Sequence, residues 1–183
     1  MRQNWQLWTE RLSDREIKKI LKKADKISSE PATIFYNQQV SQEIRSSKIK
    51  WLSGEKEILD LLFDFVNQAN DNAFRFNILK KADIQFTEYD SNDGDHYSWH
   101  HDVDWNRNDG YDRKISVTVQ LTDPKDYKGG DFEFSEVETP SSHILKPKGS
   151  ILAFPSYLKH RITPIKEGTR KSLVAWFIGP EWQ

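Results

Sequence analysis

The sequence predicts a mainly β fold with N-terminal helices (α+β), in which an antiparallel sandwich or barrel is braced by helices. Two observations predict it. Apolar residues recur at helical spacing in the N-terminal part, and from about residue 78 they alternate with polar residues at the two-residue period of strands. Many short strands after a helical start are typical of such architectures. We therefore expect a single domain over residues 1–183, with mainly helical support over 1–77 and the β core over 78–183.

Two helices are predicted in the N-terminal part. The first covers residues 13–27, where Ser13 and Glu16 have the spacing of a capping box, and the second follows Ser53. Each helix has one apolar face. The inward residues are Ile17, Ile20, Leu21, Ala24 and Ile27 in the first helix and Ile58, Leu61, Leu62, Phe65 and Ala69 in the second.

Seven strands are predicted in the C-terminal part, each from a short run of alternating or apolar residues. Turn-forming stretches such as "YKGGD", "KPKG" and "KEGT" separate them. The predicted strands cover residues 83–89, 114–121, 131–136, 142–147, 149–155, 161–165 and 171–179.

The composition excludes several classes of site. The net charge of -1 provides no basic surface for nucleic acid. No apolar run reaches the length of a membrane span, and the polar N-terminus is not a signal peptide, so a cytoplasmic protein without membrane or nucleic-acid partners is expected. Since the chain has no cysteine, any transition metal must be bound by imidazole and carboxylate groups.

The stretch "YSWHHDVDW" (97–105) contains the strongest candidate for a metal site. On an extended strand, side chains two residues apart share a face, so His100 and Asp102 point the same way and His101 points to the other side. His100 is therefore the expected ligand and His101 a structural or substrate-side residue. Asp104 shares the parity of the ligands, and a contact to a ligand, a contact to substrate and a surface position are all compatible with it.

A metal held by two residues of His-x-Asp needs a third ligand from elsewhere. A distant histidine would complete a two-histidine, one-carboxylate triad, which leaves three positions open and suits non-haem Fe(II) oxygenases. His143 and His160 are the remote candidates, while His96 and His143 are expected to be exposed. His160 is favoured because Arg170, ten residues later, could bind an acidic co-substrate beside the metal.

Four segments together resemble the Fe(II)- and 2-oxoglutarate-dependent dioxygenases, and most closely their prolyl 4-hydroxylase-like branch. They occur in the order typical of that family and cover roughly residues 84–179. The segments are "GDHYSWHHD", "DYKGGDFEF", "GSILAFPSYLKHRITPIKEGTR" and "LVAWFIG".

The resemblance implies a double-stranded β-helix, or jelly roll, with Fe(II) in its open mouth. It implies 2-oxoglutarate as co-substrate, O2 as oxidant and ascorbate as a supporting reductant. Carried over residue by residue, His100, Asp102 and His160 would bind the iron, and Arg170 the distal carboxylate of 2-oxoglutarate. Three further residues match co-substrate or pocket positions of the family: Tyr89, Gln120 and Trp176.

The activity implied is hydroxylation of a substrate C–H bond with release of succinate and CO2, the first candidate substrate being a peptidyl proline. An oxygenase for a small molecule or free amino acid is a second hypothesis. A jelly-roll binding module without turnover is a third, and the intact ligand set together with Arg170 counts against it. A peptide, a protein or a small molecule is accordingly the expected partner.

Overall fold

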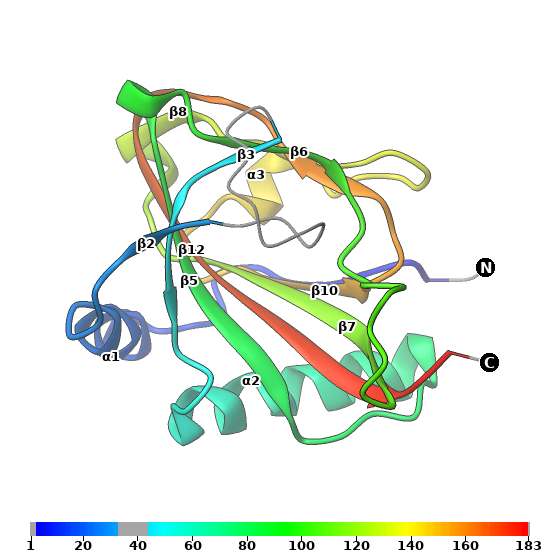
Figure 1. Cartoon of the computed structure of the whole chain (residues 1–183). Helices are drawn as coiled ribbons and strands as arrows, with labels where there is room; N and C mark the ends of the chain where they lie inside the picture. Colours follow the sequence, from blue (N-terminus) through cyan, green and yellow to red (C-terminus); the bar gives the residue numbers. More distant parts are fainter. Residues whose placement is uncertain (1–2, 33–43, 183) are drawn as a thin grey trace.

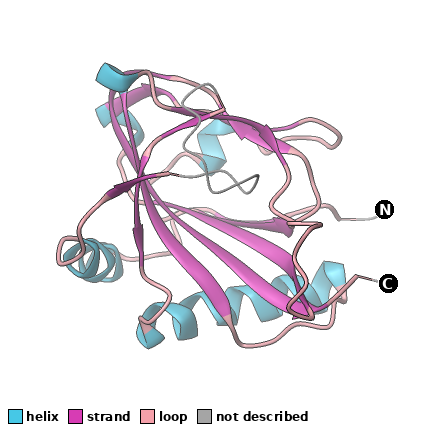
Figure 2. Cartoon of the chain, viewed as in Figure 1, coloured by secondary structure: helices cyan, strands magenta, loops and turns pink. Residues whose placement is uncertain are grey.

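The computed structural model describes residues 3–32 and 44–182. Two antiparallel sheets face each other, and two long helices lie against the outer face of the larger one (Figure 1). Strands dominate, and the helices are confined to the periphery (Figure 2). This arrangement agrees with the sandwich braced by helices that the sequence predicts.

The larger sheet contains eight strands and the smaller sheet four. In the larger sheet the order is β1 (Gln6–Trp8), β10 (Ile151–Pro155), β7 (Tyr111–Gln120), β12 (Ile165–Pro180), β5 (Ala82–Asp90), β4 (Lys48–Trp51) and β2 (Glu30–Pro31), with β8 (Tyr127–Gly129) also paired to β12. In the smaller sheet the order is β3 (Arg45–Ser46), β6 (His96–His100), β11 (His160–Ile162) and β9 (Phe132–Phe134).

Alternation along the central strands produces two separate cores. On β12, the residues Leu173, Ala175 and Phe177 pack with the helices, whereas Arg170 and Trp176 face the space between the sheets. The core between the sheets is rich in aromatic side chains. It contains Tyr89, Tyr97, Tyr127, Phe132, Phe134, Leu145, Leu152, Phe154, Leu158, Ile162 and Ile165.

Both predicted long helices are present. Helix α1 (Asp14–Ala24) begins with the predicted capping box, in which Ser13 and Glu16 satisfy each other's backbone N–H groups. Helix α2 (Lys56–Ala69) differs from the prediction at two residues of its inward face. Leu61, predicted to face inward, is only half-buried, and Val66, which was not predicted, is buried. A short π-helix, η1 (Asn70–Phe74), follows α2, and two 3-10 turns, η2 (Ser91–Asp93) and η3 (Pro124–Asp126), lie in loops.

Three details of the sequence prediction were wrong. Residues 142–147 form no strand but the short helix α3 (Ser142–Leu145), because the apolar residues Ile144 and Leu145 are adjacent and do not alternate. The segment 161–165 is divided between β11 and the start of β12. Strands β1 to β4 and β8 were missed: the first 77 residues supply edge strands as well as helices, and Tyr127–Gly129 forms a strand where a turn was expected.

No helix within residues 3–32 and 44–182 is both long and apolar enough to cross a membrane.

Candidate metal and co-substrate site

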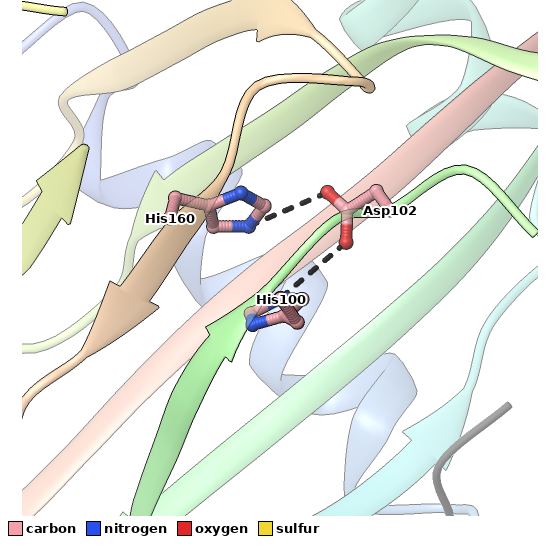
Figure 3. Close-up of side chains that lie close together, drawn as sticks. All are labelled: His100, Asp102 and His160. Atoms are coloured by element: carbon pink, nitrogen blue, oxygen red, sulfur yellow. Dashed lines mark ion pairs between the residues drawn. The ribbon is translucent and has the colours of Figure 1, made fainter. Parts of the chain in front are cut away.

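Three side chains predicted as ligands meet between the sheets. His100 ends β6, Asp102 follows two residues later, and His160 begins the neighbouring strand β11, directly opposite His100 in the register. Each histidine Nε2 lies 3.5 Å from one carboxylate oxygen of Asp102, and the potential ligand atoms all lie within 4.8 Å of one another (Figure 3). One ion could therefore contact all three.

A bulge in β6 turns His100 inward. Opposite β11, Ile162 pairs with Tyr97 and His160 pairs with His100, so β6 has one residue more than its partner strand between these pairs. Tyr97 and His100 consequently point to the same side, with their rings stacked at a centroid distance of 3.4 Å. His101 points outward and is exposed; its Nδ1 lies 2.7 Å from the Tyr157 carbonyl oxygen. The opposite directions expected for the two histidines are thus observed.

Hydrogen bonds set the tautomer of both inward histidines. The Nδ1 of His100 lies 2.7 Å from the carbonyl oxygen of Ser98, and that of His160 lies 2.9 Å from the carbonyl oxygen of Leu158. Because a carbonyl oxygen only accepts, each Nδ1 carries the proton, and in the neutral ring each Nε2 keeps a lone pair. Both lone-pair nitrogens are the atoms that lie beside Asp102.

Asp102 is anionic and His160 neutral. Asp102 is only 2% exposed. Burial pushes the pKa of its carboxyl upward, but the imidazoles of His160 and His100 and the hydroxyl of Ser116 act against this, leaving the pKa well below its usual range. The Ser116 hydroxyl donates to Oδ2 at 2.6 Å. Burial lowers the pKa of the His160 imidazole to about 4. At neutral pH these groups are in the states that bind a cation.

A buried guanidinium shares the cavity with this cluster. Arg170 is 1% exposed; it donates to Gln120 at 3.0 Å and to Ser172 at 3.4 Å, and its Nε has no partner. Its guanidinium carbon lies 5.5 Å from the ring centroid of Tyr89. Within the described ranges no carboxylate forms an ion pair with it. A buried cation without a counter-charge, aimed into a cavity, is suited to an anionic ligand.

The remaining predicted site residues divide into two groups. Tyr89 and Trp176 line the cavity, together with Ser172 and Val174 on the same face of β12. Gln120 reaches the site through its hydrogen bond to Arg170.

Three polar residues named in the sequence analysis lie outside the cavity. His96 is half-buried and His143 is exposed. Asp104 is half-buried and accepts a hydrogen bond from the backbone N–H of Asn106, so it stabilises a turn and has no contact with the ligand cluster.

Sequence reasoning missed two polar residues of the site, Ser116 and Arg45. The alternation on β7 could have placed Ser116 inward, on the face opposite Val117. No alternation pattern could have indicated Arg45, because β3 has only two residues.

Comparison with known proteins identifies the family. The sequence profile of the 2OG-Fe(II) oxygenase superfamily matches residues 84–178, about half of the chain. The chain belongs to the 2OG-Fe(II) oxygenase superfamily. The resemblance inferred from the four sequence segments is thereby confirmed.

Curated relatives of the chain include PKHD-type hydroxylases. A PKHD-type hydroxylase of Synechococcus sp. strain CC9902 is 36% identical over 83 residues, which are 45% of this chain and 36% of the relative. A PKHD-type hydroxylase of Crocosphaera subtropica is 39% identical over 62 residues, 34% of this chain and 28% of the relative. The matches thus span about a third of the length of these curated relatives.

Solved structures of the superfamily share the fold over nearly the whole chain. A prolyl-4-hydroxylase from Pseudomonas putida superposes with a TM-score of 0.71 at 21% identity, covering 95% of this chain and 92% of that one. A prolyl hydroxylase from Trichoplax adhaerens, solved with a peptide fragment of hypoxia inducible factor, has a TM-score of 0.75 at 17% identity, covering 96% and 84%. The predicted jelly-roll fold is confirmed.

The donor set of this site fits iron. Two imidazoles and one carboxylate on one side of an ion leave three positions open, the arrangement typical of non-haem Fe(II) sites. The cavity beside it contains an uncompensated cation for an acidic co-substrate.

Proposed function

We propose that this protein is an Fe(II)- and 2-oxoglutarate-dependent dioxygenase that hydroxylates a C–H bond of its substrate. The observation that supports this most is the presence, in one cavity, of a His-Asp-His cluster and a buried guanidinium without a counter-charge. A binding module without turnover has no need of both features.

Each residue of the cluster has a defined task in this proposal. His100, Asp102 and His160 hold the iron, and the carbonyl groups beside the two imidazoles fix the ring orientations. Ser116 keeps the Asp102 carboxylate oriented and anionic. When bound, iron and 2-oxoglutarate supply the oxidising chemistry, which converts 2-oxoglutarate and O2 to succinate and CO2 and puts one oxygen atom on the substrate.

Arg170 binds the distal carboxylate of 2-oxoglutarate in this proposal. A guanidinium can donate two parallel hydrogen bonds to a carboxylate, and Gln120 orients the Arg170 side chain from behind. Tyr89 and Trp176 line the cavity that would hold the co-substrate. Phe132, Phe154 and Ile162 form an apolar wall that keeps water from the reacting groups.

The first candidate substrate is a prolyl residue. Support comes from the prolyl hydroxylases among the structures of the same fold, one of them solved with a peptide. A small molecule or a free amino acid is the second candidate, favoured by the buried arginine described below. We also propose a cytoplasmic location, where 2-oxoglutarate is a common metabolite, and no nucleic-acid partner, in keeping with the net charge of -1.

The proposal is tested by measuring succinate. Purified protein supplied with Fe(II), ascorbate and 2-oxoglutarate is expected to form succinate slowly, and faster when a proline-containing peptide or proline itself is added. Mass spectrometry should then detect the gain of one oxygen atom on the substrate. His100→Ala is the control and should form no succinate. Wild-type protein that binds iron but forms no succinate under any of these conditions would refute the proposal.

A further inference from the structure

A second buried arginine lines the same cavity. Arg45, on β3, is 6% exposed. Its Nε donates to Ser47 at 3.2 Å, its Nη2 donates to Gln85 at 2.6 Å, and its guanidinium carbon lies 4.5 Å from the ring centroid of Tyr97. Within the part of the chain that the structure describes, its Nη1 makes no hydrogen bond and no carboxylate pairs with it. Two hydrogen bonds therefore hold the Arg45 side chain in place, and its Nη1 remains available to donate to a ligand.

The charges in the cavity do not balance when Arg45 is included. Under the proposed function, the charges of Fe(II), 2-oxoglutarate, Asp102 and Arg170 cancel one another. Arg45 then leaves one positive charge in excess, and its nearest polar partner, Gln85, is a neutral amide. Arg113, the other buried arginine beside the cavity, differs because Asp83 pairs with it at 3.2 Å. An uncompensated buried charge is costly, so a further anion is expected at Arg45.

Arg45 is close to the metal ligands. The ring of Tyr97 separates it from His100: the guanidinium carbon lies 4.5 Å from this ring, and the ring stacks on the His100 imidazole at 3.4 Å. Arg45 and the three metal-ligand candidates line one cavity, so an anion bound by Arg45 would lie in the cavity that contains the ligand cluster. Arg170 faces the same cavity from the larger sheet, beside Tyr89.

We infer that the substrate to be hydroxylated carries a carboxylate and that Arg45 binds it, with the reactive C–H bond directed toward the metal. This inference rests on the proposed function and narrows it. It favours a free amino acid, or the C-terminal residue of a peptide, over a residue inside a chain. For a prolyl substrate, the carboxylate would be the one on the ring's own α-carbon.

The inference is tested with two probes that differ only in charge, N-acetyl-L-proline and N-acetyl-L-prolinamide. Their binding is measured by titration calorimetry, in the absence of oxygen, to protein loaded with Fe(II) and 2-oxoglutarate. The acid is expected to bind about 10- to 100-fold more tightly than the amide, as a charge-assisted hydrogen-bond pair predicts. Equal affinities, tighter binding of the amide or no detectable binding of the acid would overturn the inference.

Gln85→Glu is the matched variant. It preserves the size of the side chain but supplies Arg45 with its own carboxylate, so the fold is kept and the preference for the acid should fall to within about two-fold. Arg45→Gln should abolish the preference in the same way. In Gln85→Glu the affinity for 2-oxoglutarate should stay within about two-fold of wild type, since Arg170 is untouched. A preference that survives Gln85→Glu contradicts the inference.

Substrate-independent succinate formation separates this inference from the proposed function. If the wild-type protein forms succinate yet binds acid and amide equally, the inference fails and the proposed function stands. If the wild-type protein forms no succinate, the proposed function fails, and with it the inference that rests on it.

Discussion

Replacing Arg170 with methionine is expected to separate co-substrate binding from folding and from iron binding. Methionine keeps much of the volume of the side chain but removes its donors and its charge. A hydrogen bond to a charged group contributes ~1.5–3 kcal/mol, so the loss of a two-bond contact with the 2-oxoglutarate carboxylate costs ~3–6 kcal/mol. At about 1.4 kcal/mol for each factor of ten, the Michaelis constant for 2-oxoglutarate should rise about 10²- to 10⁴-fold.

The fold of the Arg170→Met variant should persist. Arg170 is 1% exposed and has no carboxylate partner within the described residues, so its removal also eliminates a buried uncompensated charge, which offsets the lost hydrogen bonds to Gln120 and Ser172.

The assay is succinate formation at increasing 2-oxoglutarate concentration, with Fe(II) affinity and the thermal unfolding midpoint measured on the same preparations. Arg170→Lys is the control: it keeps the charge but loses the two-bond geometry, so its Michaelis constant should lie between those of wild type and Arg170→Met. An unchanged Michaelis constant in Arg170→Met, with iron still bound, would refute the assignment of Arg170 to the co-substrate.

Four further substitutions test other parts of the structure. His100→Ala should abolish Fe(II) binding in an iron titration, whereas His101→Ala should keep the metal, because His101 points outward to the Tyr157 carbonyl group; the reverse result would disprove the strand geometry. Ser116→Ala should weaken Fe(II) binding by about 10- to 100-fold, since it removes the 2.6 Å hydrogen bond to a ligand, and unchanged affinity would show that this bond has no influence on the metal. Leu62→Ala should lower the free energy of unfolding by about 2–5 kcal/mol in a denaturant titration while the Michaelis constant for 2-oxoglutarate stays constant, because Leu62 is fully buried on the helix side of the larger sheet.

Local patterns were sufficient to predict the long elements and the directions of several side chains in the candidate site. The capping box and apolar stripe of α1 are readable because each depends on residues within one or two turns. The shared face of Arg170 and Trp176 follows from the two-residue period of β12, which holds along that part of the strand. Where a helix or strand is regular, the spacing of its residues along the sequence predicts the direction of their side chains.

The features that were missed depend on contacts between distant segments. Strand β3 has two residues and exists because Arg45 pairs with Tyr97, which no periodicity within residues 44–51 reveals. The bulge in β6 is likewise a property of its pairing with β11. The outward direction of His101 was predicted correctly because the bulge lies before His100, leaving the parity from His100 onward intact.

The two cores differ in their contribution to the protein: one contributes apolar packing, and the other surrounds the candidate site. The core on the helix side of the larger sheet is built from aliphatic and aromatic side chains. The space between the sheets holds the metal ligands and two buried guanidinium groups, whose burial without carboxylate partners among the described residues opposes folding. Apolar packing offsets this cost, and the core on the far side of the same strands contributes to it. Because β12 contributes Leu173, Ala175 and Phe177 to that core and Arg170 to the cavity, packing against the helices fixes the register that aims the guanidinium at its ligand. Iron and 2-oxoglutarate, once bound to the folded protein, should give Asp102 and Arg170 each a partner of opposite charge and raise the unfolding temperature. Arg170→Met should reduce the part of that increase that depends on 2-oxoglutarate and leave the part that depends on iron.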